Sequence, residues 1–210
     1  MKKIKTARGR KTSSTLWLER QLTDPYVAKA KAAGYKSRAA YKLLEIDDKI
    51  KILKPGMTVV DLGAAPGGWS QVAAAKGCTV IALDILEMDE QPGVTFLKMD
   101  FMDDDAPALL INALGGKGAD AVISDLAPNT TGHRNTDHLK IMAMVDAAYD
   151  FACEVMNPNG TFIAKVRQGG AESDLLARMK KDFKTVKHIK PPASRKQSSE
   201  TYVIAIGYKG

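Results

Sequence analysis

The sequence predicts an α/β fold in which a mostly parallel sheet is covered by helices on both faces. After residue 57, short apolar runs of strand length alternate with longer helical patterns. That alternation is typical of parallel strands joined by crossover helices. The last two apolar runs follow each other without a helical pattern between them, which favours an antiparallel hairpin at the end of the chain.

The composition is that of an ordinary soluble globular protein. The 210 residues, of which 45% are hydrophobic and 26% charged, suffice for one domain with a sizeable core. Two cysteines are too few for a disulfide framework, so we expect a reducing compartment. Because no stretch of about 18 consecutive apolar residues occurs, we expect no membrane span and a cytoplasmic location.

The charge is concentrated at the N-terminus. The net charge of +7 favours an anionic partner such as nucleic acid, although such an excess is also common on soluble surfaces. Residues 1–13 contain basic residues and no acidic one, so we expect a tail that is disordered until it meets an anionic partner. We place a single domain over residues 14–210, with N-terminal helices over 14–56 and an α/β core over 57–210.

The individual elements follow from periodicity and turn signals. Helical patterns run over residues 17–33 and 37–50, and Pro55-Gly56 closes this N-terminal section. The apolar runs that predict strands are Thr58 to Val60, Thr79 to Leu83, Val94 to Leu97, Ala121 to Ile123, Thr161 to Ala164, Phe183 to Ile189 and Thr201 to Tyr208. The helical patterns between them are Trp69 to Lys76, Ala106 to Leu114, His138 to Met156, which Asn157 to Gly160 should end, and Glu172 to Lys181.

Ionisable residues follow the apolar runs that predict the parallel strands. They are Asp61, Asp84, Asp100, Asp125 and Lys165. Ligands of open α/β sheets bind beyond the carboxyl ends of the parallel strands, so this edge is the candidate site. A polar residue often marks the end of a buried strand, but matching positions on so many strands favour a functional role.

The loop from Asp61 to Trp69 follows the first predicted strand and opens a helix. Gly63 and Gly67 let the backbone approach a ligand closely. The loop does not have the glycine spacing of a dinucleotide-binding fingerprint. The carboxylate of Asp61 suits a ligand that carries a positive charge.

Two further carboxylates indicate that the ligand is an adenosine. Asp84 stands about 20 residues after the start of the loop, where a carboxylate can accept both hydroxyls of a ribose. Asp100, after the third strand, can accept a hydrogen bond from the amino group of an adenine. S-adenosylmethionine is the cationic cofactor that fits this pattern.

These residues, with several longer segments, resemble the FtsJ family of ribosomal RNA large-subunit methyltransferases. The segments span the chain after the tail and are Ser37 to Leu43, Asp61 to Gln71, Ser124 to Asn129, Lys165-Val166 and Ser199 to Tyr202. The departures are mild, since Ala40 and Tyr41 stand where bacterial members often have two aromatics, and Leu126 replaces a common Met. The resemblance implies a Rossmann-like S-adenosylmethionine-dependent methyltransferase fold, whose seven-stranded sheet has one antiparallel strand.

The resemblance also implies the residues of the site. The family's catalytic tetrad falls on Lys42, Asp125, Lys165 and Glu200, and its cofactor contacts fall on Gly67, Trp69, Asp84, Asp100 and Asp125. If the last strand is antiparallel, its start brings Glu200 to the edge where the parallel strands end. We assign Lys165 as a base or as a group that orients the acceptor hydroxyl, with the other three residues as its electrostatic frame.

The implied reaction is methylation of the ribose 2′-hydroxyl of a uridine in large-subunit ribosomal RNA, preferentially on the assembled subunit. No metal is expected, because the three histidines lack the spacing of a metal site. Nothing in the sequence calls for an obligate protein partner. Basic residues outside the tetrad should hold RNA phosphates without reading the base sequence, and they are Lys29, Lys31, Lys36, Arg38, Arg195 and Lys196.

Two other functions stay open from the sequence. A nicotinamide-dependent oxidoreductase shares the fold class and Asp84, but the loop from Gly63 to Gly68 argues against it. A non-catalytic ribosome-assembly factor also explains the basic tail, but it needs neither the tetrad nor a cofactor pocket. Binding of S-adenosylmethionine rather than NAD excludes the first, and incorporation of labelled methyl into RNA excludes the second.

Overall fold

The structure is a computed structural model that describes residues 23–128, 132–167 and 173–210. The predicted tail over residues 1–13 and the beginning of the first helical pattern lie outside these residues. The proposed boundaries between tail, N-terminal helices and core therefore stay predictions.

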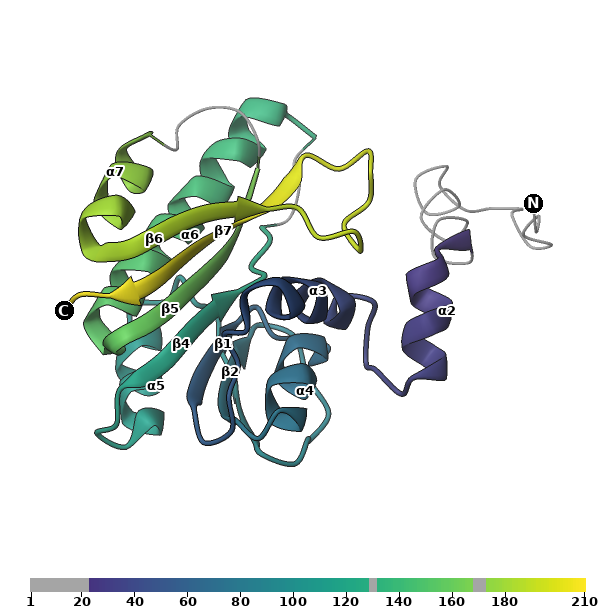
Figure 1. Ribbon diagram of the computed structural model, residues 1–210, viewed down its shortest axis with the longest axis horizontal. Coiled ribbons are helices and arrows are strands. Elements are labelled where there is room, and N and C mark those ends of the chain that lie inside the picture. The colour runs from purple at the N-terminus through teal and green to yellow at the C-terminus, as the bar shows by residue number, and fades with distance from the viewer. Residues whose placement is uncertain (1–22, 129–131, 168–172) are drawn as a thin grey trace.

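The described elements alternate as the sequence predicts (Figure 1). The helices are α2 (Pro25–Ala32), α3 (Ala40–Ile50), α4 (Gly68–Ala75), α5 (Ala106–Leu114), α6 (Arg134–Val155) and α7 (Ser173–Asp182). The strands are β1 (Thr58–Leu62), β2 (Thr79–Asp84), β3 (Val94–Lys98), β4 (Ala119–Ser124), β5 (Met156–Arg167), β6 (Phe183–Ile189) and β7 (Glu200–Tyr208).

The described strands form one seven-stranded sheet in the order β3-β2-β1-β4-β5-β7-β6. Neighbouring strands among β1 to β5 are parallel to each other. Strand β7 lies between β5 and β6 and is antiparallel to both. This confirms the predicted fold, with its mostly parallel sheet and its single antiparallel strand. It also confirms the terminal hairpin of β6 and β7, which the absence of a helical pattern predicted.

A helix over residues 17–33, which the apolar periodicity predicts as continuous, is interrupted at Asp24. Asp24 has an extended conformation, its side chain accepts a hydrogen bond from the Tyr26 amide, and Pro25 opens α2. Proline disfavours a helical conformation in the residue before it, and aspartate is a favoured N-cap. The next helix starts at Ala40 rather than at residue 37, because Ser37 forms a turn in which its hydroxyl accepts from the Ala39 amide.

Helix α6 ends just before Asn157 to Gly160, as the sequence predicts, but the strand that follows begins earlier than expected. Asn157 to Gly160 are part of β5, which begins directly after α6 ends at Val155. The register of β4 on β5 shifts there, since Ala119 pairs with Met156 but Ala121 pairs with Thr161. The residues typical of a turn are therefore taken up as an irregularity at the start of the strand.

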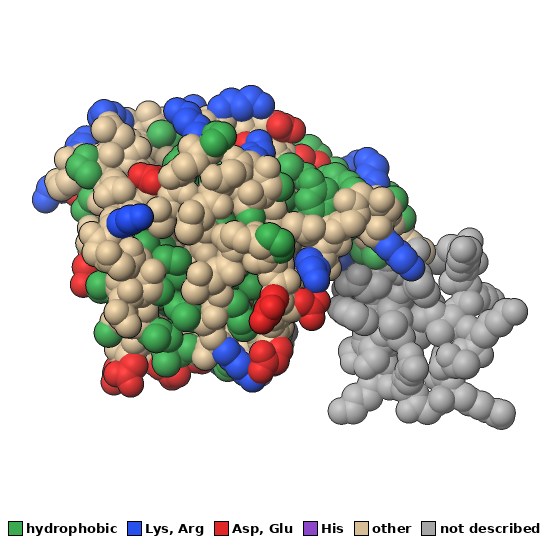
Figure 2. Space-filling model, turned by 90° about the horizontal axis from the view of Figure 1, so that it is seen from below, with side chains coloured by type: hydrophobic (Ala, Val, Ile, Leu, Met, Phe, Trp, Pro, Cys, Tyr) green, Lys and Arg blue, Asp and Glu red, His purple; other side chains and the backbone are tan. Residues whose placement is uncertain are grey.

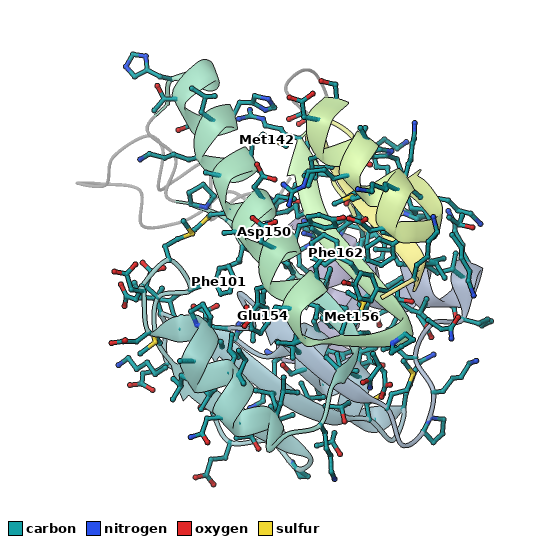
Figure 3. All side chains as sticks on the ribbon, turned by 90° about the vertical axis from the view of Figure 1, so that its left-hand side faces the viewer. Phe101, Met142, Asp150, Glu154, Met156 and Phe162 are labelled. Atoms are coloured by element: carbon teal, nitrogen blue, oxygen red, sulfur yellow. The ribbon has the colours of Figure 1, made fainter. Side chains whose placement is uncertain are left out.

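Two hydrophobic cores lie on opposite faces of the sheet. Helices α5, α6 and α7 cover one face, where Tyr149 of α6 packs on Phe162 of β5 with ring centroids 5.7 Å apart. Figure 3 shows α6 crossing in front of the sheet, with Phe162 behind it. Helices α3 and α4 cover the other face, where Trp69 packs on Tyr202 with ring centroids 5.5 Å apart. The sheet is thus buried on both faces, so residues that bind a ligand are expected at the ends of its strands.

The surface of the described chain narrows towards its N-terminal end. Figure 2 shows lysine and arginine side chains along this extension, and α2 carries Lys29 and Lys31 in its last turn. No helix in the described ranges is both long enough and apolar enough to cross a bilayer.

Candidate active site

The sheet topology brings the predicted tetrad to one edge. Asp125 follows β4 directly, and Lys165 lies near the end of β5. Arg167 pairs with Glu200 in the antiparallel register of β5 and β7, so the start of β7 lies beside the end of β5. Lys42 comes from α3, which packs on the same side of the sheet as Trp69. The site therefore combines residues from four separate parts of the chain.

The four tetrad side chains form one connected cluster. The Lys165 ammonium nitrogen Nζ is 3.1 Å from Asp125 Oδ1 and donates to the Asp125 main-chain carbonyl at 2.6 Å. Lys42 Nζ is 2.9 Å from Glu200 Oε1 and 3.7 Å from Asp125 Oδ2. Each lysine is therefore oriented by a carboxylate, and Asp125 lies between the two lysines.

The cluster is partly withdrawn from solvent. The side chains of Lys42 and Lys165 are 12% and 13% exposed, and those of Asp125 and Glu200 are 17% and 21% exposed. Burial by itself would raise the pKa of Asp125, but the neighbouring charges of Lys165 and Lys42 outweigh it and lower that pKa. Asp125 is therefore ionised at neutral pH and holds both lysines.

Tyr202 and Ser194 also belong to the cluster, although the sequence analysis did not assign them to the site. The Tyr202 hydroxyl donates to Asp125 Oδ1 at 2.7 Å and lies 3.3 Å from Glu200 Oε1, and the Ser194 hydroxyl donates to Glu200 Oε1 at 2.9 Å. Burial and the two carboxylates raise the pKa of Tyr202. Its alternation with Glu200 on β7 was the available signal, because residues two apart on a strand share a face.

A cavity of about 660 Å³ opens beside the tetrad at the strand ends. This volume is within the usual range for a small-molecule site. Five predicted site residues line it, and they are Gly63, Asp84, Asp100, Asp125 and Lys165. The cofactor side and the tetrad side of the predicted site thus share one cavity, and Asp125 and Lys165 lie where they meet.

Asp84 and Asp100 are fixed by the backbone around them. Asp84 accepts from the amides of Ala65 at 2.9 Å and Leu86 at 2.8 Å, one on each carboxylate oxygen. Asp100 Oδ1 accepts from the Met102 amide at 3.0 Å. A carboxylate oxygen has more than one acceptor position, so both groups can still accept hydrogen bonds from a ligand in the cavity.

Gly63 and Gly67 have positive φ angles of 77° and 99°. A β-carbon on Gly63 would lie 2.9 Å from the backbone of Leu126, and one on Gly67 would lie 1.8 Å from Gln91 Nε2. Glycine is therefore required at Gly63 both for its conformation and for the close approach of the loop to Leu126. Gly67 is not among the residues that line the cavity, so its contact with a cofactor stays a prediction.

Asp61 and Trp69 are buried and are not among the residues that line the cavity. Trp69 is 2% exposed, and its indole nitrogen donates to the Ala39 carbonyl at 2.9 Å. Asp61 is fully buried; its Oδ2 accepts from the Ser70 hydroxyl at 2.6 Å, and its Oδ1 has no hydrogen-bond partner in the described structure. Burial and the nearby charges of Asp125 and Asp84 raise the pKa of Asp61 to about 7, despite the hydrogen bond from Ser70.

The described residues contain no group of three or more histidine, cysteine, aspartate or glutamate side chains placed to hold a metal ion. The arrangement that they do form has two functional parts. A cavity with the carboxylates of Asp84, Asp100 and Asp125 on its wall suits a cationic ligand with hydroxyl groups, and Lys165 on the same wall can contact an acceptor group.

Comparison with known proteins finds relatives that match nearly the whole chain. The family model of FtsJ-like methyltransferases matches residues 35–208. A protein of Bradyrhizobium diazoefficiens named Ribosomal RNA large subunit methyltransferase E is 63% identical over 214 residues, covering 99% of this chain and 93% of that protein. A protein of the same name from Rhodopseudomonas palustris is 61% identical over 213 residues, covering 99% of this chain and 90% of that protein.

Solved structures share the fold. A protein of Plasmodium falciparum described as a ribosomal RNA methyltransferase aligns with a TM-score of 0.75 and 30% identity, over 84% of this chain and all of that one. A Lactococcus lactis structure at 17% identity and a TM-score of 0.60, covering 82% of this chain and 88% of that one, shows similarity of fold alone. Since the family model covers most of the sequence and the relatives match nearly all of it, the chain belongs to the FtsJ-like methyltransferase family.

Proposed function

We propose that this protein transfers a methyl group from S-adenosylmethionine to the ribose 2′-hydroxyl of a uridine in large-subunit ribosomal RNA. The observation that carries the proposal is the position of Lys165, whose Nζ is fixed by Asp125 at 3.1 Å while the residue lines the cavity. The names of the relatives support ribosomal RNA as the substrate. Ribosomal RNA is methylated where ribosomes are assembled, so we propose a cytoplasmic location.

The residues around the cavity fit the proposed cofactor. Asp61 Oδ1 is a buried polar atom without a hydrogen-bond partner among the described residues, and a cationic ligand above it would supply the missing charge. Asp84 would accept the ribose hydroxyls, and Asp100 would accept from the adenine amino group. Gly63 lines the cavity, and its lack of a side chain lets the loop pass close to Leu126. When bound, S-adenosylmethionine supplies a sulfonium methyl group that is already activated for displacement.

The protein's own task is then to hold and strengthen the acceptor hydroxyl. Lys165 Nζ donates to two oxygens of Asp125, which fixes the direction in which the nitrogen faces the cavity. As a neutral amine it takes the hydroxyl proton, and as an ammonium group it orients the hydroxyl. Lys42 balances the charges of Asp125 and Glu200. A pH profile of the transfer rate distinguishes the two roles of Lys165, because only the base role requires loss of a proton before transfer.

Replacement of Lys165 with Ala tests the assignment. Methyl transfer should fall by about 100-fold or more, while the affinity for S-adenosylmethionine stays nearly unchanged, because the lysine acts on the acceptor. Transfer is measured with labelled methyl donor on large subunits from cells that lack the enzyme, and binding by calorimetry. Lys184→Ala on β6 is the matched control, because Lys184 is exposed and its ammonium group donates to Asn159 Oδ1, away from the tetrad. Loss of cofactor binding in Lys165→Ala would contradict the assignment.

The substrate is tested by comparing assembled subunits with their RNA. We expect unmodified large subunits to be methylated faster than the same RNA freed of protein at matched salt, because a fold without a separate sequence-reading module depends on the shape of the RNA. Equal initial rates would contradict the preference for the assembled subunit. Mapping the 2′-O-methyl groups then identifies the nucleotide. The predicted tail over residues 1–13 should add phosphate contacts, so its deletion should weaken the salt dependence of RNA binding.

The two other functions make different predictions for the same protein. A nicotinamide-dependent oxidoreductase would bind NAD in the cavity, but the loop from Gly63 to Gly68 lacks the glycine spacing of the dinucleotide-binding fingerprint. A non-catalytic assembly factor would keep its effect on subunit assembly after Lys165→Ala. Calorimetry with NAD and growth of the Lys165→Ala strain test these alternatives.

A further inference from the structure

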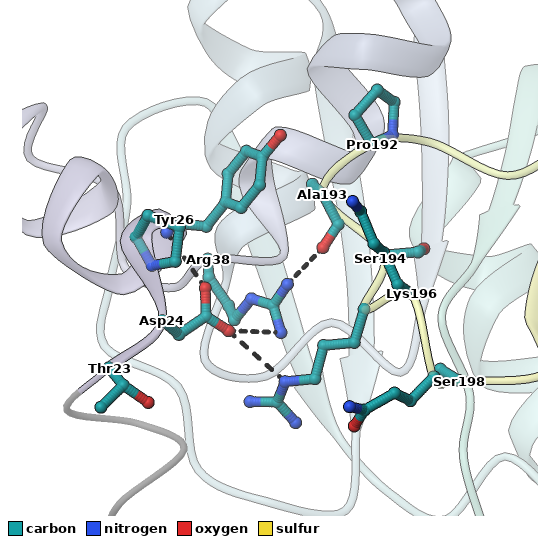
Figure 4. Close-up of a pocket in the computed structure, with 12 residues that line it drawn as sticks. Thr23, Asp24, Tyr26, Arg38, Pro192, Ala193, Ser194, Lys196 and Ser198 are labelled. Atoms are coloured by element: carbon teal, nitrogen blue, oxygen red, sulfur yellow. Dashed lines mark hydrogen bonds and ion pairs between the residues drawn. The ribbon is translucent and has the colours of Figure 1, made fainter. Parts of the chain in front are cut away.

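A second cavity, of about 570 Å³, lies between the start of α2 and the 190–199 loop that joins β6 to β7 (Figure 4). Its wall contains three basic residues, Arg38, Arg195 and Lys196, and one acidic residue, Asp24. The three basic residues are among those that the sequence predicts to hold RNA phosphates. This cavity shares no lining residue with the cavity beside the tetrad.

One carboxylate oxygen serves both arginines in this cavity. Asp24 Oδ2 is 2.9 Å from Arg38 Nη1 and 3.4 Å from Arg195 Nε. The Asp24 side chain is only 8% exposed. Arg38 Nε is buried and has no hydrogen-bond partner within the described residues. The two guanidinium groups therefore have more N–H donors than the carboxylate of Asp24 can accept from. Two neighbouring arginine side chains are a favourable site for phosphate oxygens.

The wall of this cavity is joined to the tetrad by hydrogen bonds. Ser194, which lines the cavity, donates to Glu200 Oε1 at 2.9 Å. The Ala193 amide donates to Glu45 Oε2 at 2.6 Å, and Arg38 donates to the Ala193 carbonyl. The 190–199 loop is therefore held against α3, which carries Lys42. A ligand in this cavity would lie next to the acceptor side of the site.

We propose that this cavity binds a phosphodiester group of the substrate RNA next to the acceptor nucleotide, between Arg38 and Arg195, and that the phosphate displaces the carboxylate of Asp24. The inference rests on the proposed function, since it assigns a neighbouring contact on the same RNA. In the RNA-free protein, the carboxylate of Asp24 forms ion pairs with Arg38 and Arg195. It therefore competes with the phosphate for the two guanidinium groups. The competition lowers the affinity for RNA that does not otherwise fit the site.

Replacement of Asp24 with Asn removes the competing charge and keeps the helix cap, because asparagine is as good an N-cap as aspartate. We expect several-fold tighter binding of a short fluorescein-labelled oligouridylate, measured by fluorescence anisotropy. The slope of log K against log salt should become steeper by about 0.7, the value of one more phosphate contact on a single strand. Arg195→Gln should do the opposite, with several-fold weaker binding and a shallower slope.

The double variant and a matched control separate this site from general electrostatic attraction. In Arg195→Gln, the additional change Asp24→Asn should give a much smaller gain, because one of the two competing contacts is absent. Asp150→Asn is the control, since Asp150 pairs with Arg178 on the face covered by α6 and α7. Its change in charge is the same, and it should leave the affinity nearly unaltered. Figure 3 shows Asp150 on α6.

Several results would overturn the inference. One is equal affinity gains in Asp24→Asn and Asp150→Asn, which would mean that only net charge acts. Another is weaker RNA binding in Asp24→Asn, which would mean that Asp24 only clamps the 190–199 loop. If Asp24→Asn does not fold, Arg195→Gln still decides, because its side chain is 40% exposed and an unchanged salt slope would refute the contact. Methyl transfer by the wild-type protein is measured on the same preparation, so failure of the proposed function is seen separately.

Discussion

Replacement of Asp61 with Asn changes a fully buried carboxyl group two residues before Gly63, which lines the proposed cofactor cavity. Burial, with smaller contributions from Asp125 and Asp84, raises the pKa of Asp61 from 3.8 to about 7. Asparagine resembles the protonated acid in shape, and its oxygen can still accept the hydrogen bond from Ser70. The variant therefore keeps the neutral form of the group and removes the titration.

The sign and size of the effect follow from linkage. Because the pKa is raised in the folded protein, the native state binds more protons than the unfolded chain between pH 3.8 and about pH 7, and stability is lost as the pH rises through this window. One extra bound proton changes the free energy of unfolding by about 1.4 kcal/mol per pH unit. Between about pH 5 and about pH 7 the wild type should lose about 2 kcal/mol relative to Asp61→Asn.

The assay is urea unfolding of the ligand-free wild type and variant at several values between about pH 5 and about pH 8. The difference between the two proteins cancels the titration of groups that they share, including the histidines. Asp48→Asn is the control, because Asp48 is exposed and forms a solvent-accessible ion pair with Lys51. Parallel stability curves for the wild type and Asp61→Asn would refute the raised pKa of Asp61.

The same group should couple cofactor binding to proton release. If a cationic ligand stabilises ionised Asp61, its binding near neutral pH expels the proton that the ligand-free protein holds. Calorimetry in buffers of different ionisation enthalpy measures this release directly. We expect proton release for the wild type and none from this group for Asp61→Asn, and equal values would separate Asp61 from the cofactor.

Three further predictions concern the site. Tyr202→Phe removes a hydrogen bond to the active-site aspartate, which should raise the pKa of that aspartate. The loss should lower the free energy of unfolding by about 1.5–3 kcal/mol at neutral pH and by less in acid. Tyr208→Phe on the same strand is the control, and equal effects of the two changes on methyl transfer would contradict the special role of Tyr202. Gly63→Ala should cost about 2 kcal/mol or more by urea unfolding, whereas Gly34→Ala has the same left-handed strain without a close neighbour and should cost less. Asp84→Asn should weaken S-adenosylmethionine binding by about 1–3 kcal/mol, and an unchanged dissociation constant would refute its role.

Much of the fold was accessible from the sequence because the apolar pattern is a local property. Runs such as Thr79 to Leu83 and Phe183 to Ile189 reflect burial on both faces of a sheet, and burial selects the same residue types wherever the strand lies. The errors fall where local signals compete. Asn157 to Gly160 are typical turn residues, yet they lie within β5, because Met156 before them and Thr161 after them both pair with β4. Pro25 is a local signal for a helix break, and it decides the structure, although the apolar periodicity of the same segment predicts a continuous helix.

The site divides in the same way. The aspartates after the parallel strands could be located from the sequence, because the ends of such strands meet at one edge. Lys42 and Glu200 were assigned only by family resemblance, since a lysine on a helix and a glutamate beside a loop are ordinarily solvated. The contacts of Tyr202 and Ser194 with the tetrad carboxylates needed the structure, because they depend on side chains brought together from the 190–199 loop and β7.

The sequence by itself determined the succession of strands and helices along the chain, the position of the site at the carboxyl ends of the parallel strands, and the family. Each of these depends on residue types at fixed spacings along the chain. Only the tertiary structure decided which charges meet. It places Lys42 within 2.9 Å of Glu200 and leaves Asp61 Oδ1 buried without a partner among the described residues. It also makes Asp24 the shared anion of Arg38 and Arg195. Ion pairing and burial depend on distances between residues far apart in the chain, and these distances are fixed only when the sheet and its two cores are packed.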